Sequence, residues 1–306
     1  TDTYEPGSVF KIVTSSIALE ENIVDTDTIN FNCTGAYYVP GESRPIKCHK
    51  YPYSHGAQSL RLALENSCNP AFVELGLKIG KTRSYKYYEA LGFFGKTGIS
   101  LSGEPKSIFY DINKINDHEL GTMSFGQRFT ITPLQMITAA CAIANDGTLV
   151  QPQIVDHITN TDTGEVTNFN TTEVRQVFSK ETSDKVTSMM ESVVEHGTGY
   201  RVKYDASVKE SMSGYSIGGK TGTSEPINGS SDGYVASFLA ISPVENTKIV
   251  LLVILKNPGE GVNHNGGQIA APTAGKMLSE ILPYMGIETG NKDSGNNTNI
   301  SEKDLY

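Results

Sequence analysis

A serine three positions before a lysine, Ser8 and Lys11 in the segment YEPGSVFK, is the first pair in the chain that could do chemistry. The pair lies at the start of an apolar run with helical spacing, so both side chains should share one helix face. A lysine whose charge is disfavoured by burial can take the serine proton and make the hydroxyl a nucleophile. The alternative is a helix-capping serine followed by a solvated lysine.

A second polar pair, Ser67 and Asn69, flanks Cys68 in the segment NSCNP. In locally extended backbone alternate residues point the same way, so Ser67 and Asn69 would face one side and Cys68 the other. A hydroxyl beside a carboxamide suits proton relay and recognition of an amide. The alternative is a plain polar turn between two helices.

The third motif is GGKTGT, in which Lys220, Thr221, Gly222 and Thr223 lie on a predicted strand. The lysine supplies positive potential, and the two threonines offer hydroxyls to a carboxylate. Small residues let a substrate backbone approach an edge strand, as in recognition by strand addition. A β-bulge at Gly222 is the alternative.

Three cysteines and a histidine form a fourth group, and most of it falls in an irregular stretch, residues 25–58. The candidate set is Cys33, Cys48, His55 and Cys68. Three thiolates and one imidazole make a closed structural zinc site, which would brace the stretch against the turn at Cys68. His49 competes as a ligand, but neighbouring side chains point apart in extended chain, which favours His55.

A disulfide between two of these cysteines, or free buried thiols, remains open beside zinc. The fourth cysteine, Cys141, lies in the apolar segment MITAACAIA and is predicted to be a buried thiol.

The elements that position these motifs follow from hydrophobic periodicity. The predicted helices are 8–21, 60–65, 72–79, 83–91, 133–145, 182–195 and 271–282, and the predicted strands are 215–223, 234–242 and 248–256. Helices come first, then an antiparallel meander, then a closing helix. This order predicts an α+β fold, with an antiparallel β-sheet packed between helices and an inserted helical lobe.

The net charge and the hydrophobic runs of the chain exclude some classes of function. The 306 residues carry a formal charge of −9 and no basic cluster, which argues against nucleic acid as a partner. The longest aliphatic run, residues 249–255, is far shorter than the roughly 20 residues that a membrane span needs. We expect one domain over residues 1–289, followed by a flexible polar tail over residues 290–306.

The joint occurrence of S-x-x-K, S-x-N and K-T-G in this order is typical of serine acyltransferases that recognise β-lactams. The strings YEPGSVFK, SCNPAFVELG, SFGQ, ITPLQM and GGKTGTSE resemble the transpeptidase domain of class B, monofunctional penicillin-binding proteins. The resemblance implies the penicillin-binding protein and serine β-lactamase type of transpeptidase fold. Members of this branch carry a membrane anchor, a pedestal domain and opening strands before the first motif, and we expect these to be absent from this chain.

The resemblance also implies a role for each motif residue. Ser8 would be the nucleophile, Lys11 its base and Ser67 a proton shuttle. Asn69 would hold the substrate amide and Lys220 would supply positive potential. The terminal carboxylate would be bound at the K-T-G strand by Thr221 and Thr223 beside Gly222, and the oxyanion would be stabilised by backbone N–H groups of Ser8 and Thr223.

The implied reaction is cross-linking of peptidoglycan stem peptides through a Ser8 acyl-enzyme, without a catalytic cofactor and inhibited by β-lactams. It would take place on the extracytoplasmic face of a bacterial membrane, with a glycosyltransferase of the cell-wall machinery as a partner. A serine β-lactamase and a β-lactam sensor domain are the alternatives. A β-lactamase needs a group that activates water, and no such loop stands out between Ser67 and Lys220.

Overall fold

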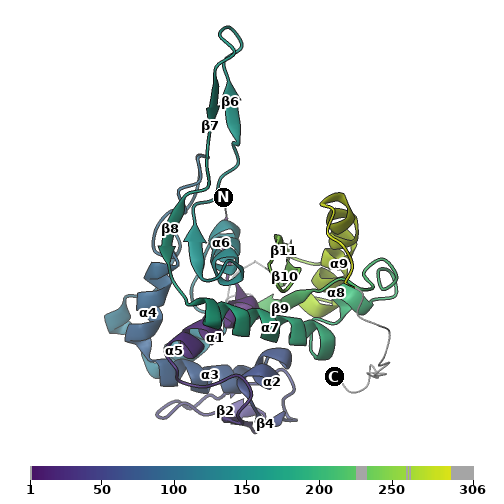
Figure 1. The fold of residues 1–306 in the computed structure, drawn as a ribbon. Coiled ribbons are helices and arrows are strands. Elements are labelled where there is room, and N and C mark those ends of the chain that lie inside the picture. Colours follow the sequence, from purple (N-terminus) through teal and green to yellow (C-terminus); the bar gives the residue numbers. More distant parts are fainter. Residues whose placement is uncertain (1, 225–232, 260, 262, 291–306) are drawn as a thin grey trace.

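The computed structural model describes residues 2–224, 233–259, 261 and 263–290. The sequence predicts a flexible polar tail over residues 290–306. Of this segment, only Gly290 lies in the described part of the chain. Figure 1 shows the course of the chain, with the N-terminal helix inside the body and a long two-stranded arm projecting from it.

The helices agree closely with the periodicity of the sequence. They are the 3₁₀ helices η1 (Gly7–Phe10) and η2 (Ile112–Lys114) and the α-helices α1 (Lys11–Glu20), α2 (Leu60–Glu65), α3 (Asn69–Ile79), α4 (Lys81–Ala90), α5 (Asp117–Met123), α6 (Pro133–Ala144), α7 (Lys180–His196), α8 (Arg201–Tyr204) and α9 (Gly266–Tyr284). Gly80, with a positive φ of 80°, separates α3 from α4, as expected of a glycine that ends a helix.

The main sheet has three antiparallel strands in the order β11-β10-β9. These are β9 (Gly218–Ser224), β10 (Val235–Ser242) and β11 (Ile249–Lys256). Short two-stranded pairs complete the strands: β1 (Phe31–Cys33) with β4 (Gly56–Gln58), β2 (Ala36–Tyr37) with β3 (Ile46–Lys47), β5 (Thr148–Val150) with β8 (Glu173–Gln176), and β6 (His157–Thr159) with β7 (Val166–Asn168).

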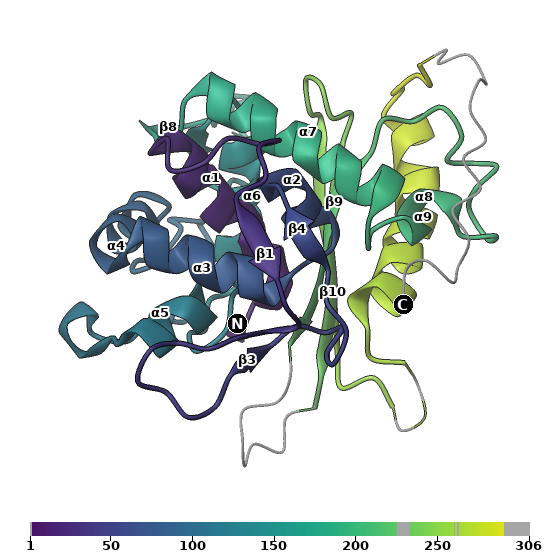
Figure 2. The same ribbon diagram turned by 90° about the horizontal axis from the view of Figure 1, so that it is seen from below.

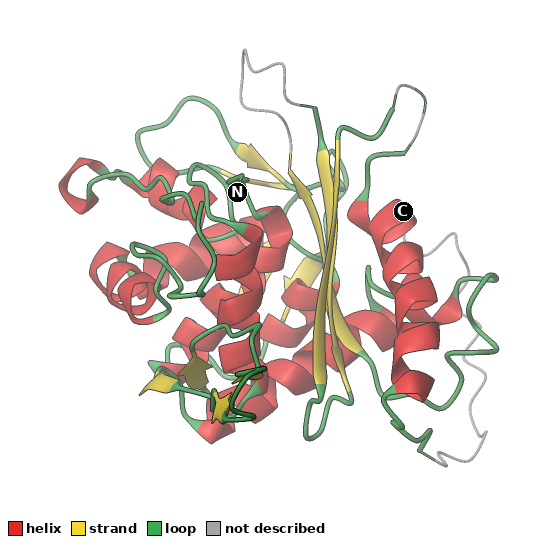
Figure 3. Cartoon of the chain, turned by 90° about the horizontal axis from the view of Figure 1, so that it is seen from above, coloured by secondary structure: helices red, strands yellow, loops and turns green. Residues whose placement is uncertain are grey.

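The sheet stands between two helical layers, as Figures 2 and 3 show. Helices α8 and α9 cover one face, and the lobe that contains α1 to α7 lies on the other. Each layer has its own apolar core: Ala270, Ala274 and Leu278 of α9 are buried against the sheet, whereas α1 is buried within the lobe. The predicted α+β class, with a sheet packed between helices, is therefore confirmed.

Several elements were not predicted. The irregular stretch over residues 25–58 contains four strands of two or three residues, too short for a periodic signal. The arm formed by β6 and β7 is exposed at every residue, so it has no apolar face to reveal it in the sequence. Among the described residues, none of the helices is both long and apolar enough to cross a membrane.

Candidate active site

The first motif lies at the start of a helix that is buried from Lys11 to Leu19. Ser8 is half-buried in η1, and Lys11, which begins α1, has no exposed surface. Gly7 has a φ of 56° and its N–H donates to the carbonyl of Gly126 at 2.9 Å. A Cβ on Gly126 would lie 2.1 Å from the Gly7 carbonyl oxygen, so only glycine allows the two backbones to approach this closely.

Lys11 makes its polar contacts with the second motif. Its Nζ donates to the Ser67 carbonyl oxygen at 2.6 Å and to Asn69 Oδ1 at 2.8 Å, and lies 3.2 Å from Ser67 Oγ. The rings of Phe72 and Phe125 lie beside the amine, with centroids 5.2 and 5.8 Å from Nζ. Burial lowers the pKa of Lys11 from 10.5 to about 7, although negative charge on nearby cysteines opposes the shift.

The turn between α2 and α3 orients Ser67 and Asn69 toward Lys11. Ser67 adopts a φ of 51°, which is unusual for a residue with a side chain, and Asn69 is the first residue of α3. Asn69 Nδ2 also donates to the Lys47 carbonyl oxygen at 3.3 Å, which ties the turn to strand β3. The thiol of Cys68, between them, contacts that of Cys48.

The third motif brings a second buried amine to the same hydroxyl. Lys220 Nζ lies 2.9 Å from Ser67 Oγ and also donates to the Thr221 carbonyl oxygen at 3.0 Å. Burial, followed by repulsion from Lys11, lowers the pKa of Lys220. The structure therefore places Ser67 Oγ between two amines that disfavour each other's charge, an arrangement suited to moving a proton.

Strand β9 lies against the turn that carries Ser8. A Cβ on Gly222 would lie 2.4 Å from Ser237 Oγ and 2.8 Å from Val9 Cγ2. The β9–β10 register runs without interruption past Gly222, so a bulge at this position is ruled out. Close packing against the neighbour of Ser8 explains the glycine, and β9 is an edge strand of the sheet, as expected.

A methyl group at Gly222 is therefore expected to separate β9 from the Ser8 turn. Gly222→Ala should lower the free energy of unfolding by about 1–3 kcal/mol. It should also slow acylation by a β-lactam roughly 10- to 100-fold, because the reacting groups are displaced. The matched control is Gly95→Ala, whose Cβ would meet no atom within 4 Å. Equal acylation rates for the two variants would contradict the role given to this contact.

One polar contact of the site was missed from the sequence. Thr198, which follows α7, lies with its Oγ1 2.9 Å from Thr221 Oγ1, and its N–H donates to the Glu65 carbonyl oxygen at 3.1 Å. Gly197 permits this approach, since a Cβ there would lie 2.6 Å from the same oxygen. The segment HGTG was the available signal: two glycines around a hydroxyl residue at a helix end indicate close backbone contacts.

Thr223, the last residue of the third motif, faces the start of α9. Its Oγ1 accepts a hydrogen bond from the Gly266 N–H at 3.1 Å. Gly7 approaches the backbone of the same residue, because a Cβ on Gly7 would lie 3.2 Å from the Thr223 carbonyl oxygen. The backbones at Ser8 and Thr223, from which the oxyanion donors were expected, are thus neighbours.

The predicted metal ligands also converge. One ligand atom each from Cys33, Cys48, His55 and Cys68 lies within 4.8 Å of all the others. Cys48 Sγ is 3.4 Å from His55 Nδ1 and 4.0 Å from His49 Nδ1, and only His55 belongs to the convergent group. Pairing of β1 with β4 sets Cys33 opposite Gly56 and so brings it near His55. Cys141 lies outside this group, in α6, and is only half-buried, so the prediction of a buried thiol is wrong in its degree of burial.

The chemistry of this cluster fits zinc. A tetrahedral zinc ion with bonds of about 2.0–2.3 Å holds its ligand atoms roughly 3.5–4 Å apart, close to the observed spread. All four cysteines are free thiols, and a hydrogen bond from Cys68 lowers the pKa of Cys48, which favours the thiolate that binds metal. His55 Nε2 is buried and has no hydrogen-bond partner among the described residues.

Comparison with known proteins agrees with the motif pattern. The family model described as "Penicillin binding protein transpeptidase domain" matches residues 1–279. Stage V sporulation protein D of Bacillus subtilis is 36% identical over 293 residues, covering 94% of this chain and 43% of that protein. Peptidoglycan D,D-transpeptidase FtsI of Escherichia coli is 27% identical over 303 residues, covering 96% of this chain and 47% of that protein. The chain thus spans less than half the length of these relatives.

Solved structures give the same result. Penicillin-binding protein 3 of Mycobacterium tuberculosis, solved in complex with aztreonam, matches with a TM-score of 0.82 and 26% identity, covering 95% of this chain and 64% of that one. The transpeptidase domain of Burkholderia pseudomallei penicillin-binding protein 3 matches with a TM-score of 0.79 and 26% identity, covering 94% of this chain and 82% of that one. The chain belongs to the penicillin-binding protein transpeptidase family, in its class B branch.

Proposed function

We propose that the chain is the catalytic domain of a peptidoglycan D,D-transpeptidase that acts through an acyl-enzyme on Ser8. One observation carries the proposal: the Ser67 hydroxyl lies between the buried amines of Lys11 and Lys220, beside the turn that holds Ser8. This arrangement offers a base and a proton relay without histidine. The names of the relatives support peptide cross-linking as the reaction.

In the proposed first step, Ser8 Oγ attacks the carbonyl carbon of the penultimate D-alanine and its proton passes to the neutral amine of Lys11. The C–N bond to the terminal D-alanine then breaks, and the leaving amine takes a proton through Ser67. In the second step, an amine of a neighbouring stem peptide attacks the Ser8 ester. It loses a proton to the base, and Ser8 Oγ leaves as a hydroxyl.

The surrounding motif residues bind the substrate in this proposal. Asn69 receives the stem-peptide amide, and Lys220 provides positive potential for the carboxylate. The hydroxyls of Thr221 and Thr223 donate hydrogen bonds to that carboxylate at the edge of β9, where Gly222 leaves room for the substrate backbone. Thr198 holds the Thr221 hydroxyl in place. The N–H groups of Ser8 and Thr223 stabilise the oxyanion.

A time course of intact mass with excess benzylpenicillin tests this function. We expect one adduct per chain that persists for hours, and peptide mapping should place it on Ser8. A β-lactamase would instead show an adduct that clears while hydrolysed drug accumulates. A sensor domain would form the adduct but would not release D-alanine from a stem-peptide substrate when an amine acceptor is present.

The pKa of Lys11 gives this function a pH dependence. Because burial lowers that pKa from 10.5 to about 7, most of the base is neutral above pH 8 and protonated below pH 6. The acylation rate should therefore rise about tenfold per pH unit up to pH 7 and level off above it. Stopped-flow rates between pH 5.5 and 9 measure the profile, and the inflection belongs to the Lys11–Lys220 pair. A profile that is flat across this range would contradict Lys11 as the base.

We also propose that Cys33, Cys48, His55 and Cys68 hold a structural zinc ion. The ion would link strands β1 and β4 to the start of α3 and would supply rigidity, not chemistry, to the site. Because Cys68 separates Ser67 from Asn69, the zinc site would fix the backbone that orients both.

The cellular setting rests on the longer relatives. We propose that residues 1–289 form the transpeptidase domain of a longer, extracytoplasmic cell-wall enzyme with an N-terminal membrane anchor, and that a glycosyltransferase polymerises the strands that it cross-links. Inhibition by β-lactams is supported by the aztreonam complex of the Mycobacterium tuberculosis protein.

A further inference from the structure

The short hairpin of β2 and β3 borders the candidate active site. Asn69, which accepts a hydrogen bond from Lys11, donates through Nδ2 to the carbonyl oxygen of Lys47 in β3 at 3.3 Å. In Figure 1 the hairpin lies at the opposite end of the body from the β6–β7 arm. It therefore directly adjoins the side chain that is proposed to receive the substrate amide.

The pairing of β2 with β3 gives this hairpin a buried and an exposed face. Ala36 lies opposite Lys47, and Tyr37 lies opposite Ile46. Opposed residues of an antiparallel pair share one face. Ile46 is buried in the apolar core, so its face is the inner one and Lys47 lies on the outer one. Tyr38, two positions after Ala36, continues the outer face by alternation and is 69% exposed.

An aromatic ring positions the Lys47 ammonium on this outer face. Lys47 Nζ lies over the ring of Tyr51, 4.5 Å from its centroid. Tyr51 is itself 50% exposed, so a ligand can reach both the ring and the ammonium from solvent. A cation–π contact restrains the ammonium without occupying its N–H donors. The outer face thus presents a positioned ammonium together with the hydroxyls of Tyr38 and Tyr51.

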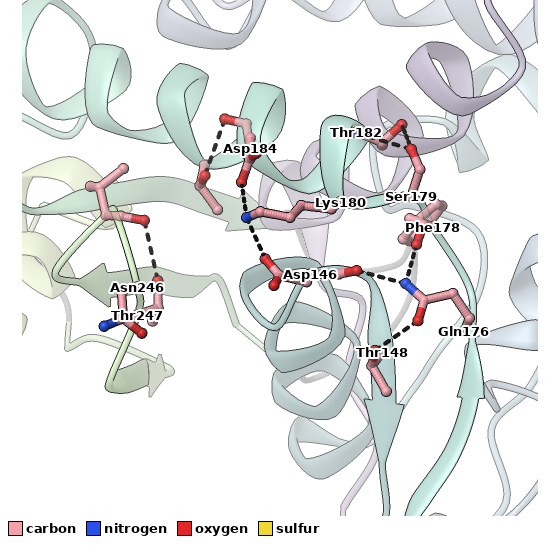
Figure 4. A network of polar contacts seen from close by, with 12 residues as sticks. Asp146, Thr148, Gln176, Phe178, Ser179, Lys180, Thr182, Asp184, Asn246 and Thr247 are labelled. Atoms are coloured by element: carbon pink, nitrogen blue, oxygen red, sulfur yellow. Dashed lines mark hydrogen bonds and ion pairs between the residues drawn. The ribbon is translucent and has the colours of Figure 1, made fainter.

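The cations of the hairpin are not neutralised by neighbouring carboxylates. Several other exposed lysines pair with acidic side chains, and Lys180 lies 2.9 Å from both Asp146 and Asp184, as Figure 4 shows. Arg44, in the loop that joins β2 to β3, and Lys47 form no ion pair within the part of the chain that the structure describes. Both side chains are exposed and can therefore pair with a ligand.

The charge of the hairpin selects an anionic ligand. Residues 36–51 contain three basic side chains and one acidic one, although the whole chain has a formal charge of −9. An ammonium and a guanidinium form strong, charge-assisted hydrogen bonds with carboxylates. An uncharged sugar would gain nothing from these cations, which favours an acidic peptide over a glycan strand as the occupant.

The proposed function gives the direction from which such a peptide reaches the hairpin. In that function the terminal carboxylate binds at β9 and a stem-peptide amide binds at Asn69. The part of the peptide that precedes this amide therefore leaves the site past Asn69. Lys47, whose backbone is bound to the Asn69 side chain, lies on this side.

We propose that the hairpin surface, made up of Tyr38, Arg44, Lys47 and Tyr51, binds carboxylates of the stem peptide that precede its D-alanine residues. The inference rests on the proposed function, because it assigns a further part of the same substrate. Arg44 and Lys47 pair with the carboxylates, and the two tyrosine hydroxyls donate hydrogen bonds to the same peptide. The hairpin surface selects acidic stem peptides and takes no part in acylation.

Two peptides that differ only in charge test the proposal, acetyl-Glu-Glu-D-Ala-D-Ala and acetyl-Gln-Gln-D-Ala-D-Ala. Their dissociation constants are measured by NMR titration of the Ser8→Ala chain, which cannot form the acyl-enzyme. We expect the Glu peptide to bind about fivefold more tightly in about 50 mM salt, and less than about twofold more tightly in about 500 mM salt. A general charge effect would give the opposite preference, because the whole chain is negative.

Arg44→Ala combined with Lys47→Ala should remove this preference, with binding of the Gln peptide changed by less than about twofold. The control is Arg83→Ala combined with Lys86→Ala in α4, which should keep the preference. It removes the same two charges from side chains that are 54% and 69% exposed, and Lys86 also lies over a tyrosine ring, 5.0 Å from its centroid. The yield of benzylpenicillin adduct, measured with Ser8 restored, checks that each variant is folded.

Three results would overturn the proposal: equal binding of the two peptides, a preference that survives without Arg44 and Lys47, or an equal loss in the control. Displacement of the Glu peptide by an uncharged chitin tetrasaccharide would also overturn it, because the hairpin would then bind the glycan strand. The proposed function is tested separately by the benzylpenicillin adduct of the unsubstituted chain. If no adduct forms, the charge preference can still be measured, and if the adduct forms while the peptides bind equally, this inference alone fails.

Discussion

Alanine in place of Ser8 is expected to abolish the covalent adduct with benzylpenicillin, slowing acylation by roughly 10⁴-fold or more. The loss should be this large because the serine oxygen is the atom that forms the bond. Stability should change little, since Ser8 is only half-buried and its hydroxyl makes no hydrogen bond with the part of the chain that the structure describes. Intact mass after one hour with excess drug measures the result.

Helix α1, which directly follows η1, offers a matched control for this experiment. Ser15 is fully buried in α1, and its hydroxyl has no hydrogen-bond partner among the described residues. Ser15→Ala removes the same atom from the adjoining helix α1 and should leave acylation unchanged, because no hydrogen bond is lost. Ser67 is the competing nucleophile. An adduct that persists in Ser8→Ala and maps to the peptide with Ser67 would overturn the assignment of Ser8.

Loss of the proposed zinc ion is expected to have the second largest effect. Zinc sites in small domains contribute about 10–16 kcal/mol, and here a large apolar core remains, so a loss of several kcal/mol is expected. For a chain of this size that loss corresponds to a fall of roughly 10 °C in the melting temperature. Acylation should fall with it, because Cys68 lies between Ser67 and Asn69. Cys48→Ser is the variant of choice, with metal content measured by atomic emission and stability by calorimetry.

Cys141→Ser is the control for this variant, since Cys141 lies outside the cluster and should leave one zinc per chain. The alternatives give different results. A disulfide would appear as a mass increase of about 2 Da on reduction and a melting temperature that falls with reductant. Free thiols would appear as a metal-free chain whose melting temperature does not respond to chelator.

The helices and the meander could be predicted because their apolar residues recur with a clear period, as in α7, where one face is buried and the other polar. The motif order also predicted that the side chains of Lys11, Ser67 and Lys220 meet, although these residues are far apart in the sequence. The cysteine cluster was predicted from the residue types that bind zinc. Its residues come together because β1 pairs with β4, and these strands are too short to predict.

Other features depend on contacts between distant segments and left little trace in the sequence. The positive φ of Ser67 follows from how α2 ends, and the residue type at this position does not predict it. Thr198 reaches Thr221 only because α7 is of the right length and ends beside Glu65. Gly222 was ambiguous between a bulge and a close approach until the position of Val9 was known. The arm of β6 and β7 has no buried face and so no periodic signal.

The close backbone contacts around Ser8 restrict how this site can evolve. Gly7 against Gly126, and Gly222 against Val9, leave no volume for a side chain on this side of the reacting serine. A variant that excludes an antibiotic by adding bulk here would also displace the nucleophile. Adaptive substitutions that separate drug from substrate therefore have to arise outside these contacts.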